Sequence, residues 1–235
     1  MSPDDVTGRE FEALADHAGE AYLRYSFTKG TAQEVRFLAE VLDLRAGMRL
    51  LDVGCGPGRH AHALRELGVE VVGLDISLAF LLTAGPGAWV RADARRLPFR
   101  GGAFDAAISL CQGGFGLLGG YDDAGVLAEM AGVVKDGGRI AVSAFSSYFA
   151  VRHLEPGDTF DAGAGVNHER AEVRNPAGEP AEFDLWTTCF TPRELRFIAA
   201  QAGLAVNAIW SVAPGSYESR PPDLAHPEFL LVAGV

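Results

Sequence analysis

The sequence predicts an α/β fold in which helices cover both faces of a mostly parallel sheet. Short apolar stretches at residues 48–53, 69–74, 104–110 and 140–145 alternate with segments of helical pattern. These stretches are too apolar for strands with one exposed face, so we expect a sheet that is buried on both sides. The first stretch leads directly into a glycine-rich turn, as in nucleotide-binding α/β proteins.

The glycine-rich turn reads DVGCGPGRH over Asp52–His60. Gly54, Gly56 and Gly58 lack a Cβ atom, so the backbone can turn tightly there and approach a ligand closely. An apolar strand that runs into such a turn and then a helix indicates a pocket for a nucleotide-type cofactor.

Three charged residues narrow the kind of cofactor. Asp75 ends the second apolar stretch, where an acid can accept hydrogen bonds from both hydroxyls of a ribose. Arg59 stands where a dinucleotide-binding turn requires its third glycine. Asp52 precedes the glycines and can orient the loop amides or hold an ammonium group. We therefore expect a cofactor with a ribose and an amino-acid end, for which a pyrophosphate is not needed.

Five segments of the chain resemble, in order, the motifs of the class I S-adenosylmethionine-dependent methyltransferases. They read LDVGCGPG, VVGLDIS, RADARRLPF, FDAAISL and DGGRIAVSAF, and the close resemblance covers Ala32–Phe145. It implies a Rossmann-like, seven-stranded and mostly parallel sheet, with S-adenosyl-L-methionine as the cofactor. It also implies that Asp75 binds the ribose, that Asp93 faces the adenine amino group and that Ala94 lies against the adenine ring. Further cofactor contacts are expected at Asp52, Gly54, Cys55, Gly56, Gly58, His60, Ile76, Leu110 and Gln112.

Residues 1–30 are expected to form an N-terminal helix and a candidate lid over this pocket. Glu10–Arg24 has helical spacing, and the aromatic segment Tyr25–Gly30 interrupts it. If the segment folds over the pocket edge, Tyr25 and Lys29 touch the methionine carboxylate of the cofactor. A simple joint between two helices is the alternative.

Two capping boxes mark the starts of helices. The first pairs Thr31 with Glu34, and the second pairs Thr191 with Glu194, followed by a proline at the first helical position. The other elements are expected as helices up to about Leu42, over Arg59–Leu67, after Ser77 and up to Gly203, and as strands around Trp89–Val90 and over Phe104–Leu110, Ile140–Phe145, Leu204–Val212 and Glu228–Val235. By the family resemblance, the last two strands form an antiparallel hairpin.

Residues 146–190 form an insertion on the substrate side of the sheet, directly after the fifth strand. A bare loop of that length is uncommon in a compact domain. Val166–Arg174 and Glu182–Thr188 alternate in residue type around the turn Asn175–Gly178, which predicts an additional β-hairpin. The insertion leaves the carboxyl end of a strand, which is the edge where open α/β sheets bind ligands.

Composition predicts one domain, residues 1–235, with a full core. Hydrophobic residues make up 48% of the chain, but no stretch of about 18 apolar residues occurs, so no membrane span is expected. Three cysteines without paired spacing and a polar, acidic N-terminus predict a cytoplasmic protein without disulfides or a metal site. The 20 basic and 31 acidic residues give a net charge of −11, which disfavours a nucleic-acid partner.

The sequence indicates the residues of the acceptor site less clearly than those of the cofactor site. Methyl transfer to an amine needs little beyond alignment and a dry pocket, whereas a hydroxyl acceptor needs a base within hydrogen-bond reach. Gln112 is a candidate for orienting the acceptor or the cofactor, with a structural loop amide as the alternative. His168, beside Glu169, is the candidate base, with an exposed strand histidine as the alternative. Trp186 and Phe190 are expected either to line an acceptor pocket or to pack in the core.

Together these observations predict methyl transfer from S-adenosylmethionine to a nitrogen or oxygen atom of a small molecule, by a monomer or a homodimer. One alternative is a methyltransferase that acts on a macromolecule, such as tRNA or a protein side chain. The other is a non-catalytic protein that binds S-adenosylmethionine.

Overall fold

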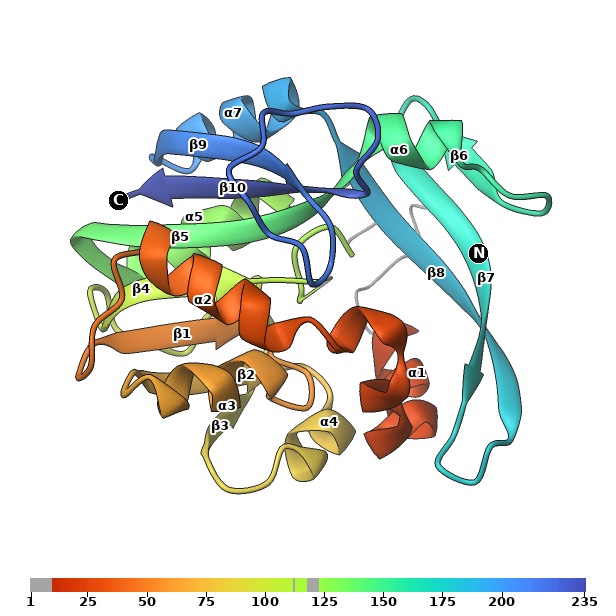
Figure 1. Cartoon of the computed structure of the whole chain (residues 1–235), viewed down its shortest axis with the longest axis horizontal. Helices are drawn as coiled ribbons and strands as arrows, with labels where there is room; N and C mark the ends of the chain where they lie inside the picture. The colour runs from red at the N-terminus through yellow and green to blue at the C-terminus, as the bar shows by residue number, and fades with distance from the viewer. Residues whose placement is uncertain (1–9, 112, 118–122) are drawn as a thin grey trace.

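A sheet of mainly parallel strands forms the centre of the molecule (Figure 1). The structure is a computed structural model and describes residues 10–111, 113–117 and 123–235. The central strands are β1 (Arg49–Val53), β2 (Glu70–Asp75), β3 (Ala88–Arg91), β4 (Phe104–Ser109), β5 (Val134–Ser146), β9 (Ala205–Val212) and β10 (Glu228–Gly234). The parallel strands lie in the order β3-β2-β1-β4-β5, β10 runs antiparallel to β5, and β9 runs antiparallel to β10. This arrangement confirms the expected Rossmann-like class of sheet, and the insertion brings the sheet to ten strands in place of the predicted seven.

Helices cover both faces of this sheet. On one face lie α2 (Thr31–Val41) and α3 (Arg59–Glu66), and on the other lie α5 (Asp123–Val133) and α7 (Pro192–Gln201) (Figure 1). Both faces are therefore dry, which explains why the strand sequences are apolar without alternation.

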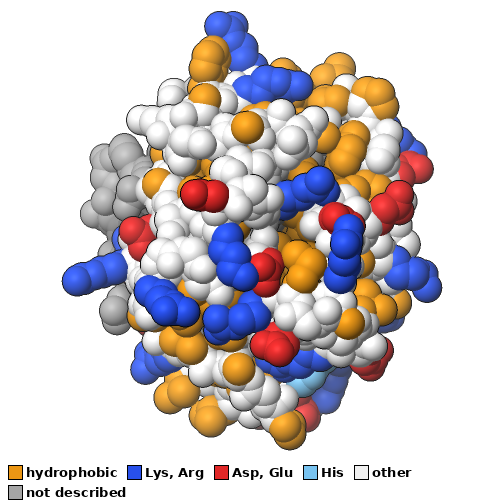
Figure 2. All heavy atoms as spheres, turned by 90° about the vertical axis from the view of Figure 1, so that its left-hand side faces the viewer, with side chains coloured by type: hydrophobic (Ala, Val, Ile, Leu, Met, Phe, Trp, Pro, Cys, Tyr) orange, Lys and Arg blue, Asp and Glu red, His pale blue; other side chains and the backbone are white. Residues whose placement is uncertain are grey.

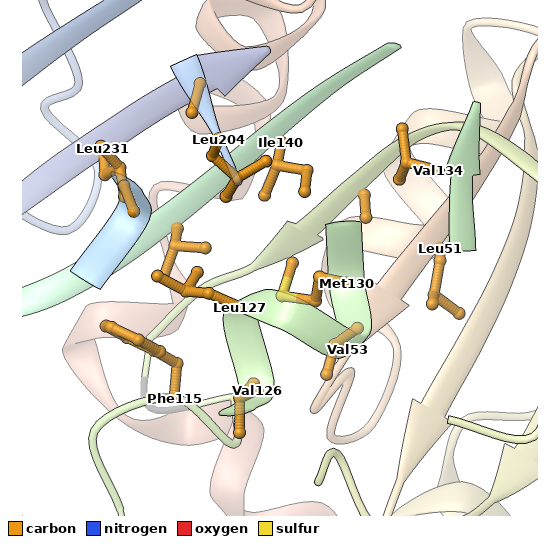
Figure 3. Packing of buried hydrophobic residues seen from close by; sticks show 14 of the residues in the cluster. Leu51, Val53, Phe115, Val126, Leu127, Met130, Val134, Ile140, Leu204 and Leu231 are labelled. Carbon is orange, nitrogen blue, oxygen red and sulfur yellow. The ribbon is translucent and has the colours of Figure 1, made fainter. Parts of the chain in front are cut away.

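The central strand β1 shows how one strand serves two cores. Leu50 packs in the same cluster as Val35 of α2. Leu51 and Val53 belong to the opposite cluster, together with Met130 of α5, as Figure 3 shows. Because neighbouring side chains on a strand point to opposite faces, each core receives alternate residues of β1.

The predicted β-hairpin of the insertion is confirmed. Strand β7 (Val166–Arg174) pairs antiparallel along its whole length with residues 180–188 of β8 (Pro180–Phe190). A short third strand, β6 (Thr159–Asp161), pairs with β7, and the helix α6 (Ser147–Arg152) leads into it from β5. The end of β8 pairs in parallel with the end of β5, so the insertion extends the main sheet at its carboxyl edge.

The N-terminal segment lies between the main sheet and the hairpin (Figure 1). The helix α1 (Glu10–Ala18) ends earlier than predicted and continues as the 3₁₀ turns Gly19–Arg24 and Ser26–Thr28. It packs against α4 (Leu78–Thr83) on one side and against β7 and β8 on the other. The segment therefore bridges the two parts of the carboxyl edge.

One of the two predicted capping boxes is confirmed. Thr191 Oγ1 accepts a hydrogen bond from Glu194 N at 3.2 Å, and Glu194 Oε2 accepts one from Thr191 N at 2.6 Å. The prediction of a capping box at Thr31 is wrong, because α2 begins without a side-chain cap and Glu34 is fully buried. Two basic side chains of α3 bind the Glu34 carboxylate, and such charge-assisted bonds are stronger than a cap.

The side where the parallel strands begin has a mixed surface. Figure 2 shows basic and acidic side chains interspersed there with apolar ones, the pattern of an ordinary solvated surface. Within the described ranges, no helix combines the length and the apolar composition needed to cross a membrane.

Candidate active site

A cavity of about 70 Å³ lies at the carboxyl edge of the parallel strands. Residues of the glycine-rich loop, of the ends of β2 and β3, of the loop after β4 and of the N-terminal segment line it. We call it the cofactor cavity, and its lining residues are Phe11, Tyr22, Gly54, Gly56, Leu74, Asp75, Ile76, Phe80, Ala92, Asp93, Ala94, Arg95, Cys111, Gly113, Gly114 and Leu117.

The glycine-rich loop packs backbone to backbone against the loop after β4. Gly54 and Gly56 have positive φ angles of 69° and 52°, which favour glycine. A Cβ atom on Gly54 would lie 1.7 Å from the carbonyl oxygen of Gly113. The close approach predicted from the glycines is therefore present in the structure.

Asp75 connects the glycine-rich loop to the start of α4. Its Oδ2 accepts a hydrogen bond from Gly56 N at 2.8 Å, and its Oδ1 accepts one from Ser77 N at 2.8 Å. Burial raises the pKa of this carboxyl, and the two N–H groups oppose that shift. Because an ionised carboxylate has about four acceptor sites, Asp75 retains acceptors for the hydroxyls of a ribose.

Asp52 is buried at the end of β1, and its Oδ2 has no hydrogen-bond partner among the described residues. Burial raises the pKa of Asp52 to about 7, and the nearby charge of Arg59 opposes this shift while that of Asp75 adds to it. A buried carboxylate without a partner is costly. The residues of this edge thus fit a cofactor that brings a ribose diol and an ammonium group, which S-adenosylmethionine has.

Asp93 and Ala94 both line the cofactor cavity, as the resemblance implies, and so does Ile76. Asp93 also binds Arg95, with the arginine Nη2 2.6 Å from the carboxylate Oδ2. Any contact with an adenine amino group would use the remaining acceptor sites of Asp93, while Ala94 and Ile76 offer apolar surface.

Aromatic side chains close the cofactor cavity on the N-terminal side. The ring of Tyr22 lies 4.8 Å from that of Phe80, and the ring of Phe11 lies 6.1 Å from it, measured between centroids. Burial raises the pKa of Tyr22, so its hydroxyl stays neutral. The sequence interpretation missed Tyr22 and Phe11 as site residues because aromatics at helical spacing are typical of ordinary core packing.

A second cavity, of about 300 Å³, lies between α6, the base of the hairpin and the end of β5. We call it the insertion cavity. Its lining residues are Phe145, Ser146, Phe149, Ala150, His153, Leu154, Glu155, Asp158, Asn167, Glu169, Thr187, Cys189 and Pro227.

The two cavities are separated by adjoining stretches of chain. Thr188 N donates a hydrogen bond to Gly116 O at 2.7 Å. The neighbours of Thr188 in β8, Thr187 and Cys189, line the insertion cavity, whereas Gly114 lines the cofactor cavity. A molecule in the insertion cavity therefore lies beside the loop that borders the cofactor cavity.

Comparison with known proteins identifies the domain. Residues 51–142 match the family described as a methyltransferase domain. Residues 51–142 are therefore similar to a methyltransferase domain. A demethylmenaquinone methyltransferase of Paenarthrobacter aurescens is 31% identical over 115 residues, which are 47% of this chain and 44% of the relative. The same enzyme of Corynebacterium kroppenstedtii is 39% identical over 109 residues, 45% of each chain. The chain thus spans about half the length of the curated relatives it matches.

Solved structures show that the likeness in fold extends over nearly the whole chain. The CcbJ methyltransferase from Streptomyces caelestis superposes with a TM-score of 0.77 at 20% identity, covering 94% of this chain and 97% of that one. At this identity the likeness shows the fold alone. The expected methyltransferase fold is confirmed, and the match over residues 51–142 agrees with the expected S-adenosylmethionine-dependent methyltransferase family.

Arg59, which replaces the third glycine in this methyltransferase domain, anchors the loop helix α3. Its Nη1 lies 2.6 Å from Glu34 Oε2, and His60 Nε2 lies 2.7 Å from the same oxygen. Burial alone would raise the pKa of Glu34, but the hydrogen bond from His60 and the charge of Arg59 lower it to about 2. Several predicted cofactor residues are buried and lie outside the cavity lining, namely Asp52, Cys55, Gly58, His60 and Leu110. Gln112 lies outside the described residues.

Three further residues that were predicted to contact the cofactor or the acceptor lie outside the cofactor cavity. The Tyr25 hydroxyl accepts a hydrogen bond from Arg174 N at 3.2 Å, so this ring joins the N-terminal segment to the hairpin. Lys29 is exposed, and neither residue lines the cofactor cavity. Phe190 stacks on Phe115 in the main core with ring centroids 5.0 Å apart, as the core-packing alternative requires.

His168 lies on the side of the hairpin that faces away from the insertion cavity. Its ring stacks on Trp186 at a centroid distance of 3.9 Å, and its Nε2 lies 2.7 Å from Asp184 Oδ1. Its neighbours Asn167 and Glu169 point the other way and line the insertion cavity. The structure does not bring His168 to either cavity, and its role as a base stays a prediction.

Proposed function

We propose that the chain binds S-adenosylmethionine in the cofactor cavity and transfers its methyl group to a nitrogen or oxygen atom of a small molecule. The observation that carries the proposal is the arrangement at one sheet edge of the glycine-rich loop and the loop-bound Asp75, which line the cavity, and of the buried Asp52, which lies outside that lining and whose Oδ2 has no partner among the described residues. In this assignment, Asp75 accepts the ribose hydroxyls and Asp52 holds the ammonium group of the cofactor.

The N-terminal segment acts as a cover in this proposal. The cofactor cavity of about 70 Å³ is smaller than the roughly 300–1,000 Å³ typical of ligand pockets. Tyr22 and Phe11 of this segment line it. We therefore expect the segment to move outward when the cofactor enters and to close over it afterwards, which keeps water from the reacting groups.

The residues present suit a reaction that depends on alignment. When bound, S-adenosylmethionine supplies a methyl carbon that its sulfonium already activates, and S-adenosylhomocysteine remains after transfer. The chain positions the two partners in adjoining cavities, and its aromatic wall excludes water. Carboxylates of the insertion cavity are placed to take the proton that the acceptor loses.

Several observations support a small acceptor. The insertion cavity of about 300 Å³ has the size of a small-molecule site, and the net charge of −11 opposes a nucleic acid. Demethylmenaquinone methyltransferases are named for a small molecule. A structural neighbour, the 1,6-didemethyltoxoflavin-N1-methyltransferase of Burkholderia thailandensis, holds its small substrate together with S-adenosylhomocysteine; it superposes with a TM-score of 0.59 at 16% identity, covering 100% of this chain and 90% of that one. All three cysteines are free thiols, which supports a place in the reducing cytoplasm.

Labelled cofactor tests the proposal. The purified chain is incubated with methyl-labelled S-adenosylmethionine and a cell extract that has been separated into small molecules, proteins and nucleic acids. We expect the label in the small-molecule fraction. Label in the protein or nucleic-acid fraction would reassign the acceptor, and cofactor binding without transfer to any fraction would indicate a non-catalytic binding protein.

A further inference from the structure

The insertion cavity opens on the inner side of the hairpin. The helix α1 covers Ala171 and Phe183 on that side, and Glu169 and Asn167 follow on the same side at the cavity. These side chains share one side because strand residues alternate. Phe11 of α1 also lines the cofactor cavity, so this side of the hairpin faces the cofactor.

The polar lining of the insertion cavity is rich in hydrogen-bond acceptors and in negative charge. Glu155, Asp158 and Glu169 contribute carboxylates, and no Lys or Arg is among the described lining residues. Asn167 Oδ1 is buried and has no hydrogen-bond partner in the described part of the chain. Burial raises the pKa of Glu169, and the charges of Asp158 and Glu155 raise it further. The described lining therefore carries three carboxylates and no Lys or Arg, and its side-chain donors are neutral hydroxyls, the Asn167 amide and the His153 ring.

A metal ion does not match these side chains. The described residues contain no group of three or more His, Cys, Asp or Glu side chains arranged to hold one. The cavity also has aromatic lining from Phe145 and Phe149, and ring faces attract organic cations. An ammonium group attached to a carbon skeleton matches both the carboxylates and the aromatic rings of the lining.

We propose that the insertion cavity binds the methyl acceptor through a protonated amino group, so that the acceptor is a small basic amine. Glu169 accepts N–H bonds from the ammonium group, Asn167 Oδ1 accepts another, and Glu155 and Asp158 add to the attraction. This inference rests on the proposed function, because it assigns the substrate class of the same site.

Binding of two probes of similar size tests the proposal. Benzylamine and benzyl alcohol differ in charge and are titrated into the full chain saturated with S-adenosylhomocysteine, with ligand-detected NMR as the readout. We expect benzylamine to bind more tightly. Glu169→Gln should weaken benzylamine binding about 10- to 150-fold, the loss of one hydrogen bond to a charged group. The matched control is Glu172→Gln, which removes an exposed acid of the same strand that pairs with Arg174 and should change nothing.

Calorimetry with S-adenosylhomocysteine on each variant separates this proposal from the proposed function. Unchanged affinity shows that the variant is folded and that the cofactor site is intact. If Glu169→Gln fails this check, Glu155→Gln replaces it, because Glu155 is exposed at the cavity rim. Equal binding of alcohol and amine, equal effects of both variants, or binding of neither probe would overturn the amine assignment. Failure of the wild-type chain to bind S-adenosylhomocysteine would instead overturn the proposed function.

Discussion

The cofactor cavity and the insertion cavity share one edge of the sheet but are built in different ways. The polar part of the first is formed by the glycine-rich backbone loop and by the buried Asp75, which backbone N–H groups hold in place. The second is formed by side chains of an insertion, with acids such as Glu169 that repel one another. A backbone-built cavity tolerates little change, whereas a cavity built from side chains can change its ligand without disturbing the fold.

The buried Glu34 and the half-buried Glu169 give the largest expected contrast. Glu34→Gln should lower the free energy of unfolding by about 3–5 kcal/mol, because it leaves Arg59 buried without its partner. Glu169→Gln should cost no stability, since it removes a carboxylate that the charges of Asp158 and Glu155 oppose. Urea unfolding of both variants measures the difference, and equal destabilisation would break the comparison.

The pH dependence of stability sharpens this contrast. The pKa of Glu34 is lowered to about 2 in the folded chain, from a model-compound value of 4.5. Its contribution to stability is therefore complete above pH 4.5 and is lost as the pH falls toward about 2. Unfolding curves of wild type and Glu34→Gln should converge over that range, and a constant gap would contradict the assignment.

A glycine substitution tests the backbone-built side directly. Gly54→Ala should destabilise the chain by about 3 kcal/mol, because its new Cβ collides with the backbone at Gly113. Gly85 is the matched control, with a φ of 70° against 69° for Gly54 and open space around it. Gly85→Ala carries only the strain of the left-handed backbone, about 1–2 kcal/mol. Thermal unfolding that ranks the two variants equally would show that the loops do not pack as described.

An affinity measurement tests the role of Asp75. Asp75→Asn should weaken S-adenosylmethionine binding by about 1.5–3 kcal/mol, roughly 10- to 150-fold, because the ribose loses a charged acceptor. The amide also accepts from Gly56 N or Ser77 N less strongly, so a small loss of stability should accompany it. Calorimetry reports the affinity, and an unchanged value on a folded variant would exclude Asp75 as the ribose acid.

A smaller effect concerns the proton on Asp52. Its pKa of about 7 means that about half of the free chain carries this proton near neutral pH. An ammonium group beside it favours the ionised form, so cofactor binding should release a proton, and affinity should rise up to about tenfold per pH unit below pH 7. Calorimetry in buffers of different ionisation enthalpy detects the proton, and Asp52→Asn should abolish its release. Equal release by both proteins would assign the proton to another group.

The parts that the sequence predicted well are those that backbone geometry dictates. The glycine-rich loop, the position of Asp75 at a strand end and the hairpin around Asn175–Gly178 follow from positive φ angles, strand ends and turn residues, which are local properties. The prediction of a capping box at Thr31 failed because Glu34 found a tertiary partner that no local pattern shows.

Predicting the acceptor site required knowing to which side of the hairpin each strand residue points. The sequence interpretation chose His168 for its chemistry, but the register of the hairpin turns it outward and turns its neighbours Asn167 and Glu169 inward. The helical spacing of Glu10–Arg24 gave Tyr22 no role at a site, and only the fold shows that Tyr22 lines a cavity. Both outcomes depend on contacts between segments far apart in the chain.

Hydrogen exchange with and without S-adenosylhomocysteine tests the central claim, that the cofactor occupies one cavity beneath the N-terminal segment and leaves the other for the acceptor. We predict increased protection of the glycine-rich loop around Gly54, of the start of α4 after Asp75 and of the segment at residues 22–30. The segments 153–158 and 167–169, which contribute side chains to the insertion cavity, should exchange as before. Protection at the insertion cavity with no change at the glycine-rich loop would contradict the account.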